Sequence, residues 1–181
     1  MRVIAGAARG IALNSPKDTR MRPTSGRVRE SLFNILAPSI NDATFLDLFA
    51  GTGAVGIEAL SRGAVSAVFV DRDSTRLIKA NLARARLQTN AIVMMADFSA
   101  ALEKCKKYYT SFNIIYIDPP YYQNLASKSL ELIAGYDLLN KNGIVIIEMA
   151  RDEDLPAARG FTAYDARGYG KSKLIFYKRG D

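Results

Sequence analysis

Hydrogen-bond acceptors beside an aromatic ring are encoded directly after the apolar run NIIYI, in Asp118, Pro119, Pro120 and Tyr121. Two successive prolines fix φ and remove two backbone donors, so carbonyl oxygens and the Asp118 carboxylate form a set of acceptors. This set suits an amino group on a flat ring: Asp118 and the Pro119 carbonyl would hold the amine hydrogens while Tyr121 stacks on the ring. A rigid turn at the end of a strand is the alternative interpretation of this motif.

A glycine-rich motif follows the apolar residues 44–49. Gly51, Gly53 and Gly56 match the pattern G-x-G-x-x-G, and Asp71 lies twenty positions after the first of them. Glycines at such a turn let the backbone reverse sharply and let a ligand approach closely. Dinucleotide enzymes use this pattern to place a pyrophosphate at a helix N-terminus. A tight turn between a strand and a helix, without a ligand, has the same pattern.

The carboxylate of Asp47 helps to choose between these ligands. It lies four positions before Gly51, where it would repel an incoming diphosphate. A ligand with a positively charged amino group fits better, and S-adenosylmethionine has an ammonium, a sulfonium, a ribose and no phosphate. We therefore count Asp47, Phe49, Gly51 and Gly53 among the predicted cofactor-binding residues. A helix-capping or turn aspartate is the alternative interpretation of Asp47.

Aspartates also follow the next two apolar runs. In parallel sheets, ligands bind beyond the carboxyl ends of the strands. Asp71 is expected to accept two hydrogen bonds from the ribose diol. Asp97, with Phe98 beside it, is expected to meet the adenine amino group, although an aspartate at this place often only caps a helix. The predicted chemistry requires no metal ion.

Strands and helices alternate along the chain in the way that positions such a site. The apolar runs predict strands at 44–49, 66–70, 91–95, 113–117 and 143–148, separated by helices at 54–62, 74–87, 98–107 and 125–135. Several runs are apolar throughout, which indicates a parallel, doubly wound α/β sheet covered on both faces. The segments FTAYDAR and KLIFYKR then predict a closing antiparallel hairpin.

The N-terminal part of the chain is basic. Residues 1–13 predict a short hairpin, and Thr24 or Ser25 is expected to cap a helix that ends near Leu36. Net charge is +7, and residues 1–30 hold seven basic side chains but only two acidic ones. Such an arm suits a polyanion, although a solvated basic surface is the alternative. The predicted RNA-binding residues are Arg9, Arg20, Arg22, Arg27 and Arg29.

Composition excludes several classes of protein. The 181 residues, 49% of them hydrophobic, suit one globular domain. The chain has no histidine and one cysteine, Cys105, so histidine-dependent catalysis and most zinc sites are excluded. Cys105 between two lysines is either a reactive thiol or an incidental helix residue. No apolar run reaches the roughly 20 residues of a membrane span, and no secretory signal is recognisable, so we expect a cytoplasmic protein. No long coiled-coil pattern indicates an oligomer, and we expect a monomer.

Two longer stretches carry a resemblance to a known family. The segment DLFAGTGAVGIEALSRGA together with DPPY resembles amino-group methyltransferases that use S-adenosylmethionine. RPTSGRVRESLFNIL (Arg22–Leu36), preceded by IAGAARG, is similar to the RsmD family of bacterial 16S rRNA guanine-N2 methyltransferases. The resemblance covers nearly the whole chain. Two positions depart from it: Ile11 replaces a second basic residue, and Gly26 replaces an acidic one.

This resemblance implies a fold, a reaction and a partner. The fold would be Rossmann-like, with a mostly parallel seven-stranded sheet. The reaction would be methyl transfer from S-adenosylmethionine to the N2 amine of one guanine in 16S rRNA, within the assembled small ribosomal subunit. Asp118, Pro119, Pro120 and Tyr121 would hold the base. Residues 1–40 would form a basic RNA-binding extension, and residues 41–181 the methyltransferase domain.

Three alternatives remain open from the sequence. A DNA adenine-N6 or cytosine-N4 methyltransferase would use the same acceptors, but it needs a recognition domain for which the chain has no room. An NAD(P)-dependent oxidoreductase fits the glycine pattern but neither Asp47 nor the DPPY motif. An RNA-binding or assembly protein with an inactive site would fit the basic arm alone.

Overall fold

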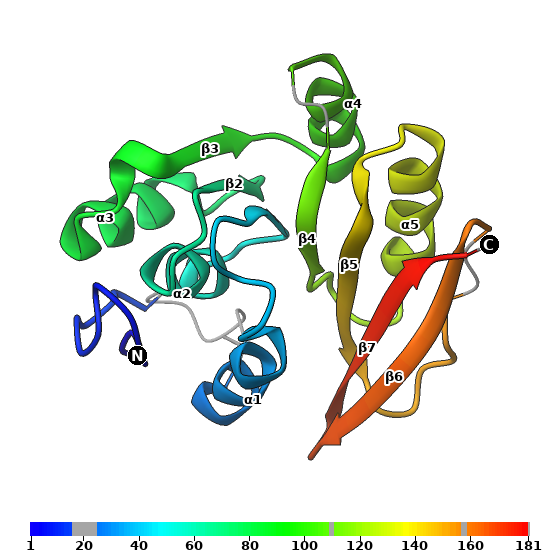
Figure 1. Ribbon diagram of the computed structural model, residues 1–181, viewed down its shortest axis with the longest axis horizontal. Coiled ribbons are helices and arrows are strands. Elements are labelled where there is room, and N and C mark those ends of the chain that lie inside the picture. The colour runs from blue at the N-terminus through cyan, green and yellow to red at the C-terminus, as the bar shows by residue number, and fades with distance from the viewer. Residues whose placement is uncertain (16–24, 109–110, 157–158, 181) are drawn as a thin grey trace. The chain divides into compact units, whose positions relative to one another are not determined.

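The computed structural model describes residues 1–15, 25–108, 111–156 and 159–180 (Figure 1). Within it the chain divides into two compact units, Met1–Ala96 and Asp97–Asp181. The expected boundary at residue 40 does not separate these units, because the N-terminal residues belong to the first of them. Each unit is an α/β structure with its own strands and helices.

The first unit is built on three parallel strands. β1 (Thr44–Leu48) pairs with β2 (Ser66–Asp71), and β2 pairs with β3 (Ala91–Met95). The connecting helices are α2 (Ala54–Ser61) and α3 (Thr75–Ala85), and Figure 1 shows α3 against β3. These five elements confirm the predicted ones to within two residues at each end. A short 3-10 helix, η1 (Gln88–Asn90), leads into β3.

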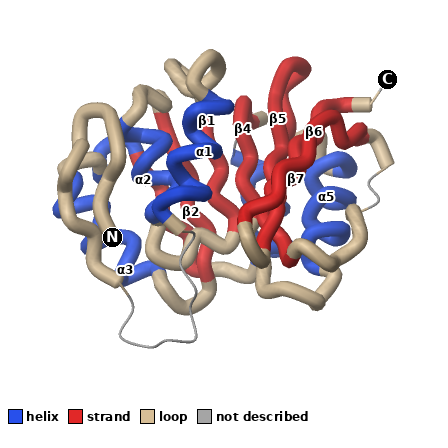
Figure 2. The backbone as a smooth tube through the Cα atoms, turned by 90° about the horizontal axis from the view of Figure 1, so that it is seen from below, coloured by secondary structure: helices blue, strands red, loops and turns tan. Residues whose placement is uncertain are grey.

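Helix α1 (Gly26–Leu36) begins at the predicted cap. The Ser25 hydroxyl accepts a hydrogen bond from the backbone N–H of Val28 at 3.2 Å. Its buried face includes Phe33, whose ring stacks on Phe45 of β1 at a centroid distance of 6.4 Å. This contact packs α1 against β1, and Figure 2 shows the helix in front of that strand. The helix therefore begins and ends where the sequence predicts.

The N-terminal residues form the expected hairpin, reduced to one antiparallel bridge between Arg2 and Ala12. The backbone N–H of Val3 donates to Ile11, at 3.0 Å. Gly6 has φ +82°, and a Cβ there would lie 1.7 Å from the Ser61 carbonyl oxygen. Only glycine fits this approach, which brings the hairpin directly onto α2.

The second unit combines parallel and antiparallel pairing. β4 (Phe112–Ile117) runs parallel to β5 (Leu139–Ala150), which pairs antiparallel with β7 (Ser172–Arg179) and through it with β6 (Phe161–Tyr169). Helices α4 (Phe98–Tyr108) and α5 (Leu125–Gly135) complete it. The predicted C-terminal hairpin is confirmed, in orange and red in Figure 1.

Strand β5 begins four residues earlier than predicted. The polar residues Asn140 to Asn142 interrupt the apolar pattern at the start of the strand, but Leu139 still pairs with Phe112 before the register shifts. The α/β class, the mostly parallel strands and the antiparallel end are otherwise as expected. The strands number seven among the described residues.

Cys105 is a core residue of α4. It is fully buried, and burial raises the pKa of its thiol to about 11. A thiol that stays protonated at neutral pH is a poor nucleophile, so the reactive-thiol interpretation is wrong and the incidental one holds.

Among the helices that the structure describes, none has the length and apolar character needed to cross a membrane.

Candidate active site

The glycine-rich turn joins β1 to α2 in the first unit. Phe49, Gly51 and Gly53 have φ values of +67°, +55° and +76°, so three of five consecutive residues are left-handed. Gly53 is the N-cap of α2, which places the backbone N–H groups of the first helical turn at this loop. Gly56 serves packing instead, because a Cβ there would lie 2.3 Å from the Phe69 ring. A ligand can therefore approach the turn closely, because no side chain is in the way, and it would meet the backbone N–H groups at the start of α2.

Asp71, at the carboxyl end of β2, organises this turn. One carboxylate oxygen accepts the N–H of Gly51 at 2.9 Å, and the other accepts those of Asp73 and Ser74 at 2.9 and 2.7 Å. The same side chain thus holds the glycine loop and the start of α3. The lone pairs of the Asp71 carboxylate that remain could accept hydrogen bonds from a ribose diol.

Asn81 also holds the glycine turn, and sequence reasoning missed it. It is fully buried in α3, and its amide nitrogen donates to the carbonyl oxygen of Thr52 at 2.9 Å and to that of Asn14 at 3.1 Å. Its amide oxygen accepts the N–H of Asn14 at 2.7 Å. A polar residue at a core position of an amphipathic helix was the available signal.

Asp47 lies beneath the turn, 1% exposed, and accepts the N–H of Gly56 at 2.9 Å. Burial raises the pKa of its carboxyl from 3.8 to about 7, the Gly56 hydrogen bond opposes the shift, and the charge of Asp71 adds to it. The structure therefore shows the helix-capping contact that the sequence left open. A cation near this buried carboxyl would favour its ionised form.

Replacing Asp47 with asparagine is expected to flatten the pH dependence of stability. With a folded pKa near 7, the folded chain binds the Asp47 proton more tightly than the unfolded chain, so wild-type stability falls as the pH rises from about 4 to 7. Asparagine cannot titrate, yet its amide oxygen still accepts from Gly56. We expect the variant to be more stable than wild type at pH 8 by at least about 1 kcal/mol. Urea unfolding from pH 4 to 8 measures this, and parallel curves for both proteins would contradict it.

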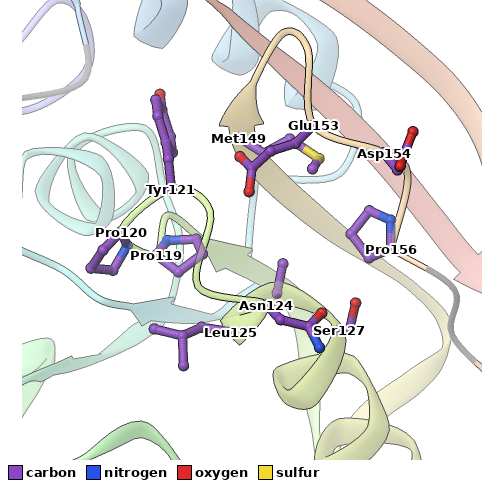
Figure 3. A pocket seen from close by; sticks show the side chains of 11 residues that line it. Pro119, Pro120, Tyr121, Asn124, Leu125, Ser127, Met149, Glu153, Asp154 and Pro156 are labelled. Carbon is purple, nitrogen blue, oxygen red and sulfur yellow. The ribbon is translucent and has the colours of Figure 1, made fainter.

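The DPPY motif follows β4 in the second unit. Asp118 and Tyr121 are half-buried, Pro119 is buried and Pro120 is exposed. Pro119, Pro120 and Tyr121 line a pocket of about 60 Å³ together with the start of α5 and the segment after β5 (Figure 3). The remaining lining residues are Asn124, Leu125, Ala126, Ser127, Met149, Glu153, Asp154 and Pro156. The structure thus places three residues of the motif, Pro119, Pro120 and Tyr121, at one pocket.

Asp97 and Phe98 begin helix α4. One Asp97 oxygen accepts the backbone N–H of Ser99 at 3.0 Å and its hydroxyl at 2.8 Å, and the Asp97 carbonyl accepts the N–H of Ala101. This contact is a helix cap, the alternative interpretation of Asp97. Phe98 is half-buried beside it. Binding of adenine by Asp97 and Phe98 stays a prediction.

Sequence reasoning missed the acidic turn after β5. The Glu153 carboxylate accepts the backbone N–H of Tyr122 at 2.7 Å and that of Ala150 at 2.9 Å. Asp152 accepts the Tyr122 hydroxyl at 2.9 Å. The residues are about thirty positions apart in the sequence, and no local pattern indicates the pairing.

The predicted RNA-binding arginines fall into three groups. Arg9 and Arg27 are exposed in the first unit. Arg29 is 2% exposed; it donates to the carbonyl of Arg2 at 2.5 Å and lies 3.7 Å from the Glu58 carboxylate. It is an internal residue, so its predicted role as a surface phosphate contact is wrong. Arg20 and Arg22 lie outside the described residues. At the two departures, Ile11 and Gly26 are exposed.

Comparison with known proteins gives a consistent result. A family model described as Conserved hypothetical protein 95 matches residues 1–178. The ribosomal RNA small subunit methyltransferase D of Escherichia coli is 38% identical over 86% of this chain and 78% of its own, and that of Haemophilus influenzae is 33% identical over 98% and 93%. The solved structure of a hypothetical protein from Thermus thermophilus superposes with a TM-score of 0.84, at 32% identity, over 98% of this chain and 99% of that one.

Proposed function

Because the chain belongs to the RsmD family of ribosomal RNA small subunit methyltransferases, we propose that it methylates one guanine of 16S rRNA at the exocyclic N2 amine. The proposed methyl donor is S-adenosylmethionine, and the proposed substrate is the assembled small subunit in the bacterial cytoplasm. We propose that the enzyme acts as a monomer. The observation that carries this proposal is the DPPY motif at the carboxyl end of β4 in the second unit, where Pro119, Pro120 and Tyr121 line a pocket.

The residues of the first unit fit the proposed cofactor. The left-handed turn at Gly51 and Gly53 leaves room for close approach, and the buried carboxyl of Asp47 suits a positive amino group. Asp71 has lone pairs for a ribose diol beside the hydrogen bonds that it already accepts. We propose Asp97 and Phe98 for the adenine. When bound, S-adenosylmethionine supplies a methyl group activated by a positive sulfur.

The residues of the DPPY motif would position the base. Asp118 and the Pro119 carbonyl would accept the two N2 hydrogens, which directs the nitrogen lone pair away from them and towards the methyl carbon. Tyr121 would stack on the guanine and fix its plane. The amine held in this way would receive the methyl group that S-adenosylmethionine supplies, and its surplus proton would pass to solvent. Catalysis by orientation needs no histidine and no metal ion.

Exposed arginines of the first unit are the proposed phosphate contacts. Replacing Arg9 and Arg27 together with glutamine is expected to weaken rRNA binding and to reduce the slope of log K against log salt by about 1.5, because each lost contact removes roughly 0.7–0.9. Fluorescence anisotropy between 50 and 300 mM salt measures the slope. A matched control neutralises Lys107 and Lys141, two exposed lysines of the second unit. A double variant with the wild-type slope would exclude the arginines.

Methylation of purified ribosomal particles tests the proposed reaction. Small subunits from cells that lack the gene are incubated with the protein and S-adenosylmethionine, and their rRNA is digested and analysed by mass spectrometry. One additional methyl group on a single guanine is expected, with less product from naked 16S rRNA. Product on duplex DNA but not on rRNA would favour the DNA methyltransferase alternative.

A further inference from the structure

The turn that follows β5 is tied by two hydrogen bonds to Tyr122, the residue behind the DPPY motif, and a third holds the turn to Ala150 at the end of β5. Glu153 accepts the backbone N–H groups of Tyr122 and Ala150, and Asp152 accepts the Tyr122 hydroxyl. The Lys173 ammonium on β7 donates to the Glu153 carbonyl oxygen and so anchors the turn itself. In Figure 3 the Glu153 carboxylate points towards the loop that carries Tyr121.

The backbone at Tyr122 needs such support. Its φ is +60°, a left-handed conformation that side chains with a Cβ adopt only at a cost in free energy. A conformation of this kind persists where its surroundings hold it. The hydrogen bond at 2.7 Å from the Tyr122 N–H to an ionised acceptor is of the stronger, charge-assisted type.

Tyr122 in turn contacts the ring that is proposed to stack on the base. The rings of Tyr121 and Tyr122 lie 6.3 Å apart at 89°, an edge-to-face arrangement that aromatic pairs favour. The Tyr122 backbone carries the ring that makes this contact with Tyr121. A shift at Tyr122 would misplace the stacking surface without removing any group that touches the substrate.

We propose that Glu153 is a positioning residue for methyl transfer, which orients Tyr121 by holding the backbone of Tyr122. The assignment rests on the proposed function. Only a carboxylate has an acceptor oxygen for each of the two backbone N–H groups. A glutamine of the same shape presents its own NH₂ group to one of them, so Glu153→Gln separates this role from simple packing.

Glu153→Gln is expected to lower kcat at least tenfold, because small displacements of a positioned group slow a reaction strongly. Affinity for S-adenosylmethionine and the melting temperature are expected to stay near wild-type values. Glu131→Gln is the matched control, since Glu131 is an exposed carboxylate on α5 of the same unit, and its kcat is expected to be unchanged. Tyr122→Phe keeps the ring and the N–H, so it is expected to lose less than threefold.

A double-mutant cycle with Tyr121→Ala shows whether Glu153 acts through Tyr121. Once the ring is absent, adding Glu153→Gln is expected to slow the reaction by less than twofold. Hydrogen exchange at the Tyr122 amide, measured without substrate, is expected to accelerate in Glu153→Gln. Additive losses in the cycle, a wild-type kcat in Glu153→Gln or unchanged exchange would each overturn the assignment. An inactive wild-type protein would overturn the proposed function, and this assignment with it, whereas failure of the cycle leaves the proposed function intact.

Discussion

Replacing Asp118 with alanine is expected to lower kcat by about 10²–10³, with affinity for S-adenosylmethionine unchanged. The carboxylate is proposed to accept a hydrogen from the reacting amine, and removing one preorganised polar contact to a reacting group commonly costs this much. Asp118 lies at the end of β4, in a different unit from the glycine turn and Asp71. Single-turnover methylation of small subunits gives the rate, and calorimetry gives the cofactor affinity.

Two further variants control this experiment. Asp118→Asn keeps the size and one acceptor oxygen, so its rate is expected to lie between those of alanine and wild type. Glu131→Ala removes an exposed carboxylate from the same unit and is expected to behave as wild type. Turnover by Asp118→Ala at the wild-type rate would remove Asp118 from the site. Normal ribosome assembly in cells that carry only this variant would favour the inactive RNA-binding alternative.

The order of strands and helices was predictable from the sequence because apolar periodicity and capping are local. Helix α1 begins at its cap Ser25, and β4 ends directly before Asp118. Both boundaries depend only on residues nearby in the sequence. The start of β5 was not predictable in this way, because tertiary pairing of Leu139 with Phe112 extends the strand past polar residues.

The individual roles of charged residues were harder to predict. Arg29 has the positive charge expected of a phosphate contact, yet its side chain lies inside the fold, where it donates to the carbonyl oxygen of Arg2. Asp47 and Asp97 both make capping contacts, which a sequence cannot distinguish from ligand contacts. Glu153 acts on Tyr122 from 31 positions away, and only the pairing of β5 beside β4 brings the two residues together.

Replacing Glu58 with alanine is expected to have the largest effect on stability. Glu58 is fully buried on α2 and accepts the backbone N–H groups of Ile4 and Ala5 at 2.8 and 3.0 Å. The guanidinium of Arg62 donates to it at 2.8 Å, and that of the buried Arg29 lies 3.7 Å away. Without this carboxylate the Arg29 charge stays buried while two backbone donors lose their acceptor. Breaking a buried ion pair on one side typically costs about 3–5 kcal/mol.

Urea unfolding measures this loss, and a second substitution shows where it comes from. If the buried Arg29 charge is the main cost, Arg29→Met combined with Glu58→Leu is expected to recover more than half of the lost stability, because apolar side chains replace both charges. The two backbone N–H groups of residues 4 and 5 still lack an acceptor in this double variant, so recovery should stay incomplete. Full recovery would show that the N-terminal hairpin contributes nothing through these bonds. No recovery would assign the loss to the hairpin alone, and protease cleavage within residues 1–13 would then accelerate in both variants.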